Sequence, residues 1–176
     1  MDYFLRSRRL GFRHWADEDF PLAQALWGDP EVTRLFGGPF PQEMVRTRLA
    51  HEIRTSEERG IQYWPIFLLE DHQHVGCAGL RPHPAQEAAL ELGFHLRPSF
   101  WGQGLATEAA LVVLEYAFST LGIETIFAGH HPSNDASRRV LGKIGFVYVG
   151  DEFYAPSGVM EPIYVFRQED WRSRQK

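Results

Sequence analysis

Hydrophobic and polar positions follow two different periods along this chain. From Leu105 to Leu121, apolar side chains return every three or four residues, which predicts an amphipathic helix. Shorter apolar runs, bounded by turn-forming residues, predict strands. The expected strands cover residues 9–15, 62–69, 74–81, 88–96, 125–131, 147–153 and 161–167, and the expected helices cover residues 17–26, 42–59, 105–121 and 135–144.

Residues at the ends of these segments support the same elements. Asp17 and Glu18 are acids suited to a first helical turn, and Gly60 suits a C-terminal helix cap. The polar run 70–73 indicates a hairpin turn between two strands. Hairpins in the middle of the chain and helical connections later predict an α/β fold, a mixed sheet with helices on its faces. No repeat or linker interrupts the pattern, so we expect a single domain over residues 1–176.

Composition and charge narrow the class of protein. The chain has 176 residues, 44% hydrophobic and 23% charged, as in folded globular proteins. A nonspecific nucleic-acid binder would usually be basic, whereas this chain carries a formal charge of −5. The N-terminal segment is charged where a signal peptide is apolar, and no apolar run reaches the roughly 18 residues that span a bilayer. We therefore expect a cytoplasmic protein with no nucleic-acid or membrane partner.

Cys77 is the only cysteine, which excludes an intrachain disulfide and a thiolate zinc cluster. Its apolar neighbours favour an inert buried thiol over a nucleophile. The chain has no H-E-x-x-H motif and no comparable spacing of metal ligands. We therefore expect chemistry that uses neither a metal ion nor an enzyme thiol.

The most informative stretch runs from a predicted strand through a glycine-rich turn into a predicted helix, over residues 91–107. Gly102 and Gly104 lack a Cβ, so the backbone can turn tightly and a ligand can approach its N–H groups. Free amides and the positive end of the helix dipole then suit an anion such as a diphosphate. The dinucleotide motif fails at Thr107, and a P-loop sequence is absent. The alternative is that the two glycines only cap a loop.

The residues around this turn resemble a known family. The segment 101–109, Trp-Gly-Gln-Gly-Leu-Ala-Thr-Glu-Ala, is similar to the acetyl-coenzyme A motif of the GNAT N-acetyltransferases, and the nearer match is the branch of ribosomal-protein N-terminal (alanine/serine) acetyltransferases. Further segments agree in order: 9–13 with Asp19 resembles the opening strand and helix, 29–32 the usual loop, and 134–146 the second signature. The resemblance implies the GNAT fold, a mixed, mostly antiparallel sheet flanked by helices.

The resemblance also implies a coenzyme site. Backbone amides in the glycine turn would bind the diphosphate: Gly102, Gln103, Gly104, Leu105 and Ala106. The strand before the turn would splay from its neighbour and pair with the pantetheine arm through Phe94, His95 and Leu96. Asn134 would hydrogen-bond that arm, and Ser137 would lie near the thioester sulfur.

Two positions depart from the commonest form of the family. Trp101 stands where Gln or Arg is frequent, so one side-chain contact to phosphate is missing and the amides carry more of the binding. Leu141 stands where many members carry a tyrosine general acid. Ser137 is the substitute that the branch suggests.

Glu91 is the candidate general base. In its strand it shares a face with Gly93 and His95, whereas Leu92 and Leu96 share the other. A carboxylate in mid-strand is costly unless it has a partner or works in a cleft, so an ion pair with an arginine is the alternative. The competing bases are His95, His130 and His131. Because neighbours in a strand point to opposite faces, we expect at most one of the last two in the site.

Together these observations predict an enzyme that transfers an acetyl group from acetyl-coenzyme A directly to a primary amine. A noncatalytic acyl-coenzyme A-binding module and an antibiotic-modifying acetyltransferase are the alternatives. The acceptor, a small molecule or a protein N-terminus, carries no motif, and both a monomer and a homodimer stay open. Four aromatic residues are candidates either for the acceptor pocket or for the core: Trp27, Phe36, Tyr63 and Trp64.

Overall fold

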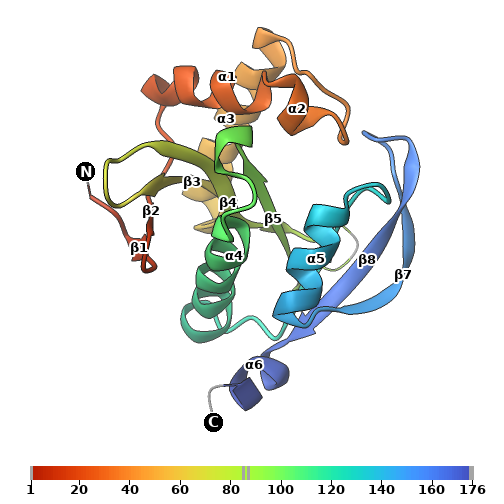
Figure 1. Ribbon diagram of the computed structural model, residues 1–176. Coiled ribbons are helices and arrows are strands. Elements are labelled where there is room, and N and C mark those ends of the chain that lie inside the picture. The colour runs from red at the N-terminus through yellow and green to blue at the C-terminus, as the bar shows by residue number, and fades with distance from the viewer. Residues whose placement is uncertain (1, 85, 87, 175–176) are drawn as a thin grey trace.

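A computed structural model describes the chain except residues 1, 85, 87, 175 and 176. Eight strands form one sheet in the order β1-β2-β3-β4-β5-β6-β8-β7 (Figure 1). The strands are β1 Leu5–Arg6, β2 Leu10–Phe12, β3 Tyr63–Leu68, β4 His74–Pro82, β5 Leu90–Leu96, β6 Thr125–Gly129, β7 Val147–Tyr154 and β8 Val159–Arg167. The α-helices are α1 Phe20–Trp27, α2 Pro30–Thr33, α3 Gln42–Arg59, α4 Leu105–Glu115, α5 Asp135–Ile144 and α6 Gln168–Arg174.

Strand pairing is antiparallel throughout the described sheet except between β5 and β6, which are parallel. The parallel pair follows from α4, which crosses between those two strands. The expected mixed, mostly antiparallel sheet flanked by helices is therefore confirmed. None of the described helices combines the length and apolar composition needed to cross a membrane.

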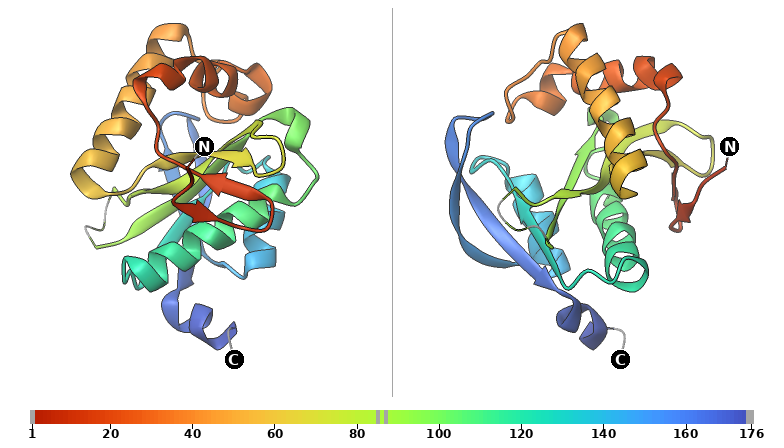
Figure 2. Two further views of the ribbon diagram at one scale, coloured as in Figure 1. Left: turned by 90° about the vertical axis from the view of Figure 1, so that its left-hand side faces the viewer. Right: turned by 180° about the vertical axis from the view of Figure 1, so that it is seen from behind.

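The two faces of the sheet bury two separate hydrophobic clusters. Alternation along β3 sends Trp64 into the cluster under α4 and α5, and sends Tyr63 into the cluster under α1 and α3. Figure 2 shows α3 and α4 on opposite sides of the sheet. Cys77 lies fully buried in the α1–α3 cluster, and burial raises the pKa of its thiol far above the usual range. The expected inert thiol is consistent with this position.

Several element boundaries differ from the sequence-based expectation. The opening strand is a short hairpin, β1 and β2, whose turn is tightened because the Ser7 hydroxyl accepts from the Leu10 N–H at 2.9 Å. The segment expected as a loop at 29–32 contains the short helix α2, which Asp29 caps by accepting from the Glu31 and Val32 N–H groups. The C-terminal helix α6 was not predicted.

The strand expected over 125–131 stops at Gly129. In the pairing of β6 with β8, Gly129 lies opposite Ile163, so His130 would lie opposite Pro162. Proline has no N–H and cannot continue the hydrogen-bond ladder. His130 and His131 therefore lie beyond the strand, and the alternation expected for them does not apply. The expected helix 105–121 likewise ends as α4 at Glu115 and continues as one π-helical turn, Tyr116–Thr120.

Candidate active site

The glycine turn leaves an open cradle at the start of α4. Gly102 and Gly104 adopt φ angles of +73° and +75°, a region that glycine enters without strain. A Cβ at Gly102 would meet no atom within 4 Å, and one at Gly104 would meet only the Arg9 Nη2 at 3.8 Å. Within the described chain, the amides from Gly102 to Ala106 have no backbone acceptor. The turn therefore fits a bulky anion such as a diphosphate.

Side chains hold this turn in place from three directions. The Trp101 Nε1–H donates to the Leu96 carbonyl at 2.7 Å, which ties the turn to the end of β5. Gln103 Nε2 donates to the Ser99 carbonyl at 3.0 Å, and Arg9 Nη1 donates to the Gln103 carbonyl at 3.1 Å. Trp101 thus braces the backbone of the turn, while Arg9 brings a positive charge to it.

Glu108 explains how Arg9 reaches the turn. Its carboxylate accepts from the Ser7 hydroxyl at 2.6 Å, the Arg9 N–H at 2.8 Å and the Arg9 Nε at 2.7 Å. The β1–β2 hairpin is thereby fastened to the first turn of α4. The sequence analysis gave Arg9 no role at the glycine turn. The turn lies almost a hundred residues away in the chain, and no local sequence pattern connects the two.

The strand before the turn separates from its neighbour. On one side β5 pairs with β4 along its whole length, up to Leu96 opposite Gly76. On the other side it pairs with β6 only at Leu90 and Glu91. The β6-facing backbone of residues 92–96 therefore has no strand partner among the described residues, and it offers N–H and C=O groups to an extended ligand.

The side chains on β5 alternate as predicted. Leu92 and Leu96 are buried in the α4 cluster and Phe94 packs against it, whereas His95 lies on the opposite face. Residues 94–96 thus present backbone rather than side chains to the gap between β5 and β6. Their assignment to the pantetheine arm stays a prediction.

The second signature begins α5. Asn134 Oδ1 accepts from the Ser137 N–H at 3.0 Å and caps the helix, which is the structural role that an N-cap asparagine commonly has. The α4 and α5 helices pack together and run in the same direction, so their N-termini lie at the same end of the molecule (Figure 1). Leu141, at the position where a tyrosine is common, is buried in the core.

Glu91 lies on the face of the sheet opposite α4 and pairs with an arginine. Its Oε1 accepts from Arg81 Nη2 at 2.5 Å, and the two residues are direct cross-strand neighbours. Among the described residues Oε2 has no hydrogen bond, so one carboxylate oxygen stays available. The ion pair orients the Glu91 carboxylate on this face of the sheet.

A second carboxylate, Glu161 on β8, was missed by the sequence analysis. It accepts from the Ser157 hydroxyl at 2.9 Å, and its Oε2 lies 3.9 Å from the position of a Cβ at Gly129. Burial raises the pKa of Glu161, with the nearby charge of Glu91 adding to the rise, while the two histidines beyond β6 oppose it. Glu161 could have been found from the sequence by the reasoning applied to Glu91, because it is the only acid in the largely apolar strand segment 159–167.

The three candidate histidines have different environments. His95 is stacked on Phe36 at 4.5 Å, and its Nδ1 accepts from the Trp27 Nε1–H at 3.3 Å. Burial, with the charges of Arg48 and Arg81, holds the pKa of His95 well below its usual value, so this imidazole stays neutral. Trp27 is therefore part of the core, and half-buried Phe36, outside the two described clusters, covers His95.

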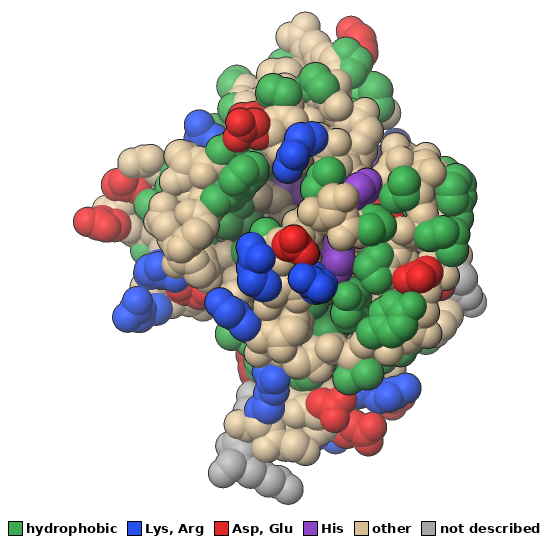
Figure 3. Space-filling model, turned by 45° about the vertical axis from the view of Figure 1, so that its right-hand side comes forward, with side chains coloured by type: hydrophobic (Ala, Val, Ile, Leu, Met, Phe, Trp, Pro, Cys, Tyr) green, Lys and Arg blue, Asp and Glu red, His purple; other side chains and the backbone are tan. Residues whose placement is uncertain are grey.

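His130 and His131 lie near Glu161, whose pKa their charges lower. His130 Nδ1 is 2.8 Å from the His131 carbonyl and so donates to it, which leaves Nε2 to accept from the Tyr164 hydroxyl at 3.3 Å. His131 Nδ1 accepts from the Ser133 N–H at 3.1 Å. In the space-filling view, histidine side chains reach a hollow of the surface, and exposed hydrophobic side chains gather beside it (Figure 3).

Comparison with known proteins agrees with this geometry. Residues 9–147 match the acetyltransferase (GNAT) domain family. FsC-acetyl coenzyme A-N(2)-transacetylase of Aspergillus fumigatus is 32% identical over 190 residues, covering 98% of this chain and 79% of its own. A crystal structure of a GNAT-family acetyltransferase from Bacillus anthracis has a TM-score of 0.81 at 25% identity, over 94% of this chain and 98% of that one.

The ribosomal-protein-S5-alanine acetyltransferase of Vibrio fischeri has a TM-score of 0.73 at 18% identity, over 97% of this chain and 99% of that one. This last likeness concerns the fold alone and does not assign the chain to a branch. The family match and the relative above 30% identity extend over most of the chain. The protein therefore belongs to the GNAT family of acetyltransferases and is an N-acetyltransferase.

Proposed function

We propose that the protein transfers the acetyl group of acetyl-coenzyme A directly to a primary amine, either on a small molecule or at a protein N-terminus. The observation that carries this proposal is the separation of β5 from β6 directly before the open glycine turn. An unpaired strand edge suits the amides of the pantetheine arm, and the turn suits the diphosphate. Ser137 and Asn134, at the start of α5, belong to the same coenzyme site in this proposal.

The reaction needs a neutral amine and a departing thiolate. The amine nitrogen attacks the thioester carbon, the new C–N bond forms, and the C–S bond breaks as the tetrahedral intermediate collapses. The amine proton goes to Glu91, directly or through water, with Glu161 as the neighbouring acceptor. The Ser137 hydroxyl passes a proton to the leaving sulfur while taking one from solvent, to which Glu91 returns the amine proton, so the serine stays neutral. Because the amine attacks the thioester directly, no covalent enzyme intermediate is required.

Acceptor-dependent release of coenzyme A tests the proposal. Purified protein with acetyl-coenzyme A is assayed for free thiol against a panel of small amines and unblocked peptides, including N-terminal alanine and serine peptides for the ribosomal-protein branch. At least one acceptor should give thiol release above the rate of hydrolysis. Tight binding of acetyl-coenzyme A without release by any amine or peptide would instead favour a noncatalytic binding module.

Gly104→Asp tests the glycine turn. The substitution adds bulk and negative charge to the open cradle, and we expect it to weaken acetyl-coenzyme A binding by roughly 100-fold or more in calorimetry. Gly60→Asp is the matched control, because Gly60 also has a positive φ, +70°, with no atom within 4 Å of a built Cβ. Equal affinity in the two folded variants would remove the turn from the coenzyme site.

A further inference from the structure

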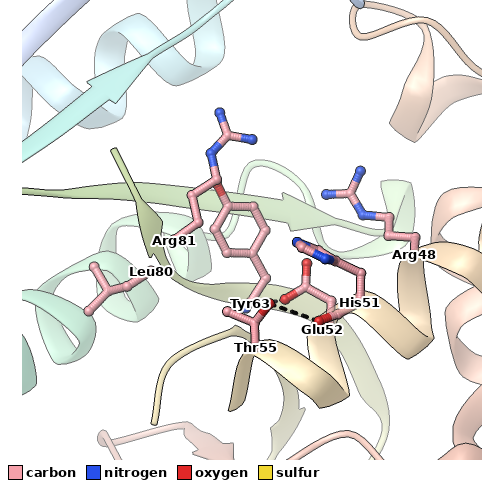
Figure 4. A pocket seen from close by; sticks show the side chains of 7 residues that line it. All are labelled: Arg48, His51, Glu52, Thr55, Tyr63, Leu80 and Arg81. Carbon is pink, nitrogen blue, oxygen red and sulfur yellow. Dashed lines mark hydrogen bonds between the residues drawn. The ribbon is translucent and has the colours of Figure 1, made fainter. Parts of the chain in front are cut away.

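A small pocket of about 180 Å³ lies between α3 and the sheet. Figure 4 shows two guanidinium groups, those of Arg48 on α3 and Arg81 on β4, directed to the same end of the pocket, with the Tyr63 ring beside Arg81. The lining residues are Arg48, His51, Glu52, Thr55, Tyr63, Leu80 and Arg81.

The two arginines differ in whether their guanidinium groups have ion-pair and hydrogen-bond partners. Arg81 is paired with Glu91 at 2.5 Å. Arg48 lies over the Trp27 ring, with its guanidinium carbon 4.6 Å from the ring centroid. Its Nε is buried without a hydrogen-bond partner, and no carboxylate of the described residues is within ion-pair distance. A buried donor on a permanent cation is costly unless a ligand supplies the acceptor.

The acid in this pocket, Glu52, forms no ion pair with Arg48 among the described residues. Glu52 is buried, and its Oε2 accepts from the Tyr63 N–H at 2.8 Å. Burial raises the pKa of Glu52, so its charged form is disfavoured. The pocket therefore combines Arg48, which has no ion pair among the described residues, with Arg81, which is paired with Glu91, and with one buried acid that the Tyr63 N–H already engages.

The pocket opens on the face of the sheet that carries the candidate base. Arg81 lies directly across from Glu91 in the β4–β5 register. The Tyr63 hydroxyl covers Gly93, where a Cβ would collide with it, and so lies between Glu91 and His95 along β5. An anion bound between Arg48 and Arg81 would therefore be a neighbour of Glu91, on the face away from α4.

We propose that this pocket binds an oxyanion, a carboxylate or a phosphate, on the acceptor, with Arg48 as its main partner. The proposal rests on the proposed function and names the acceptor class: amines that carry an acidic group. Guanidinium forks bind carboxylate and phosphate by paired, charge-assisted hydrogen bonds. Stacking on Trp27 holds the Arg48 fork in place before the ligand arrives. The anion then anchors the acceptor while its amine reaches Glu91.

Matched acceptors test this specificity. Amino acids and short acidic peptides are compared with their amides, which lack the carboxylate, and O-phosphoethanolamine is compared with ethanolamine. Wild-type protein should favour the anionic member of a pair, and Arg48→Gln should raise KM for that member by roughly 10- to 100-fold, with little effect on the neutral member. Arg48→Lys, which keeps the charge and loses the fork, should fall between. The carboxylate and phosphate pairs distinguish the two sources of the oxyanion.

Arg46→Gln is the matched control, because exposed Arg46 is on the same helix and also lies over an α1 ring, 3.7 Å from the Phe20 centroid. It should behave as wild type. The proposal would be overturned if wild-type protein showed no preference for anionic acceptors. It would also be overturned if folded Arg48→Gln raised KM equally for both members of a pair.

A binding measurement separates this proposal from the proposed function. Calorimetry with succinate and with inorganic phosphate, in the presence of coenzyme A, should show binding to wild-type protein and to Arg46→Gln, and weaker binding to Arg48→Gln. If neutral amines are acetylated but neither anion binds, acetyl transfer stands and the anion site is wrong. If an anion binds through Arg48 but no amine releases thiol, the proposed function is wrong and the site stands.

Discussion

At the scale of single residues, the site depends on charged groups placed in an otherwise apolar sheet. Glu91 and Glu161 come from strands separated by β6, and each has a local partner, Arg81 or Ser157, that orients one oxygen. Burial raises the pKa of Glu161, and the charge of Glu91 adds to that rise. Two carboxylates on one face are suited to accepting a proton from an amine.

Glu91→Gln tests the base. The substitution keeps the size of the side chain and removes its charge, so kcat/KM should fall by roughly 100-fold near pH 7, where an alkylamine is mostly protonated. The loss should shrink as pH rises and free amine becomes abundant. The measurement is kcat/KM against pH for wild type, Glu91→Gln and Glu161→Gln.

The shape of the pH profile decides among the roles. An equal loss at every pH would assign Glu91 to positioning of the acceptor. No loss for Glu91→Gln, together with a pH-dependent loss for Glu161→Gln, would transfer the role to Glu161. Two unaffected variants would leave His130, His131 or solvent as the acceptor of the proton.

His74 is a buried base whose titration bears on stability. Both ring nitrogens are buried without partners among the described residues, and burial, with the nearby Arg97, lowers its pKa to about 4. The unfolded chain binds a proton near pH 6.5, so between pH 6.5 and 4 it holds more protons than the folded protein. Stability should therefore fall as pH falls through this window, by up to about 3 kcal/mol at pH 4.

His74→Phe should flatten that part of the stability curve, because phenylalanine suits a site between Trp15 and Phe67 and does not titrate. Denaturant unfolding of both proteins at pH 7, 6, 5 and 4 measures the difference. Parallel curves would assign the acid sensitivity to other groups, such as the Arg13–Asp19 pair, where hydrogen bonds from Arg13 and the Ala16 N–H lower the pKa of Asp19 despite its burial.

At the scale of elements, the junction of β1, β2 and α4 positions the coenzyme turn. Three hydrogen bonds to Glu108 fasten the hairpin, and Arg9 extends from it to the Gln103 carbonyl. Helix α4 is then fixed at its N-terminus, where its free amides face the cradle. The glycine turn is therefore held in place by the β1–β2 hairpin, which lies near the N-terminus, far from the turn in the sequence.

Glu108→Gln should loosen this junction. The variant loses the ion pair and weakens the three hydrogen bonds, so we expect a loss of about 1–3 kcal/mol in unfolding free energy and several-fold weaker acetyl-coenzyme A binding. Glu57→Gln, at an exposed site on α3, should change neither. Denaturant unfolding and calorimetry measure the two effects. Unchanged coenzyme affinity in a destabilised Glu108→Gln protein would separate the junction from the coenzyme site.

At the scale of the whole molecule, the coenzyme site collects segments from distant parts of the chain: the β1–β2 hairpin, the end of β5, the start of α4 and the start of α5. A ligand that binds all of them only in the folded state must stabilise the protein. At a free concentration of 100 times its Kd, acetyl-coenzyme A should add about 2.7 kcal/mol to the unfolding free energy.

Hydrogen exchange should locate this stabilisation. Added protection is expected in the β6-facing amides of residues 92–96 and in the turn amides of residues 102–106, which have no backbone partner among the described residues, and not in the edge strand β7. Gly104→Asp should show neither the stabilisation nor the protection. Protection confined to other segments would place the coenzyme elsewhere.

The sequence by itself determined the features that depend on neighbours along the chain. The glycine turn before α4 and the alternation of β5 were predicted and are present, and Asn134 caps α5 from the residue directly before it. The order of hairpins and crossovers also predicted the fold class. These features depend on local periods, φ preferences and caps, which a few consecutive residues contain.

The tertiary structure decided which distant residues meet. Sheet order places β8 beside β6, and thereby brings Glu161 to Glu91; packing of α3 on the sheet brings Arg48 to Arg81; the hairpin brings Arg9 to the turn. The early end of β6 depends on Pro162 in another strand. A local period assigns a side chain to a face, but its partners there depend on strand order and helix packing, which are properties of the whole chain.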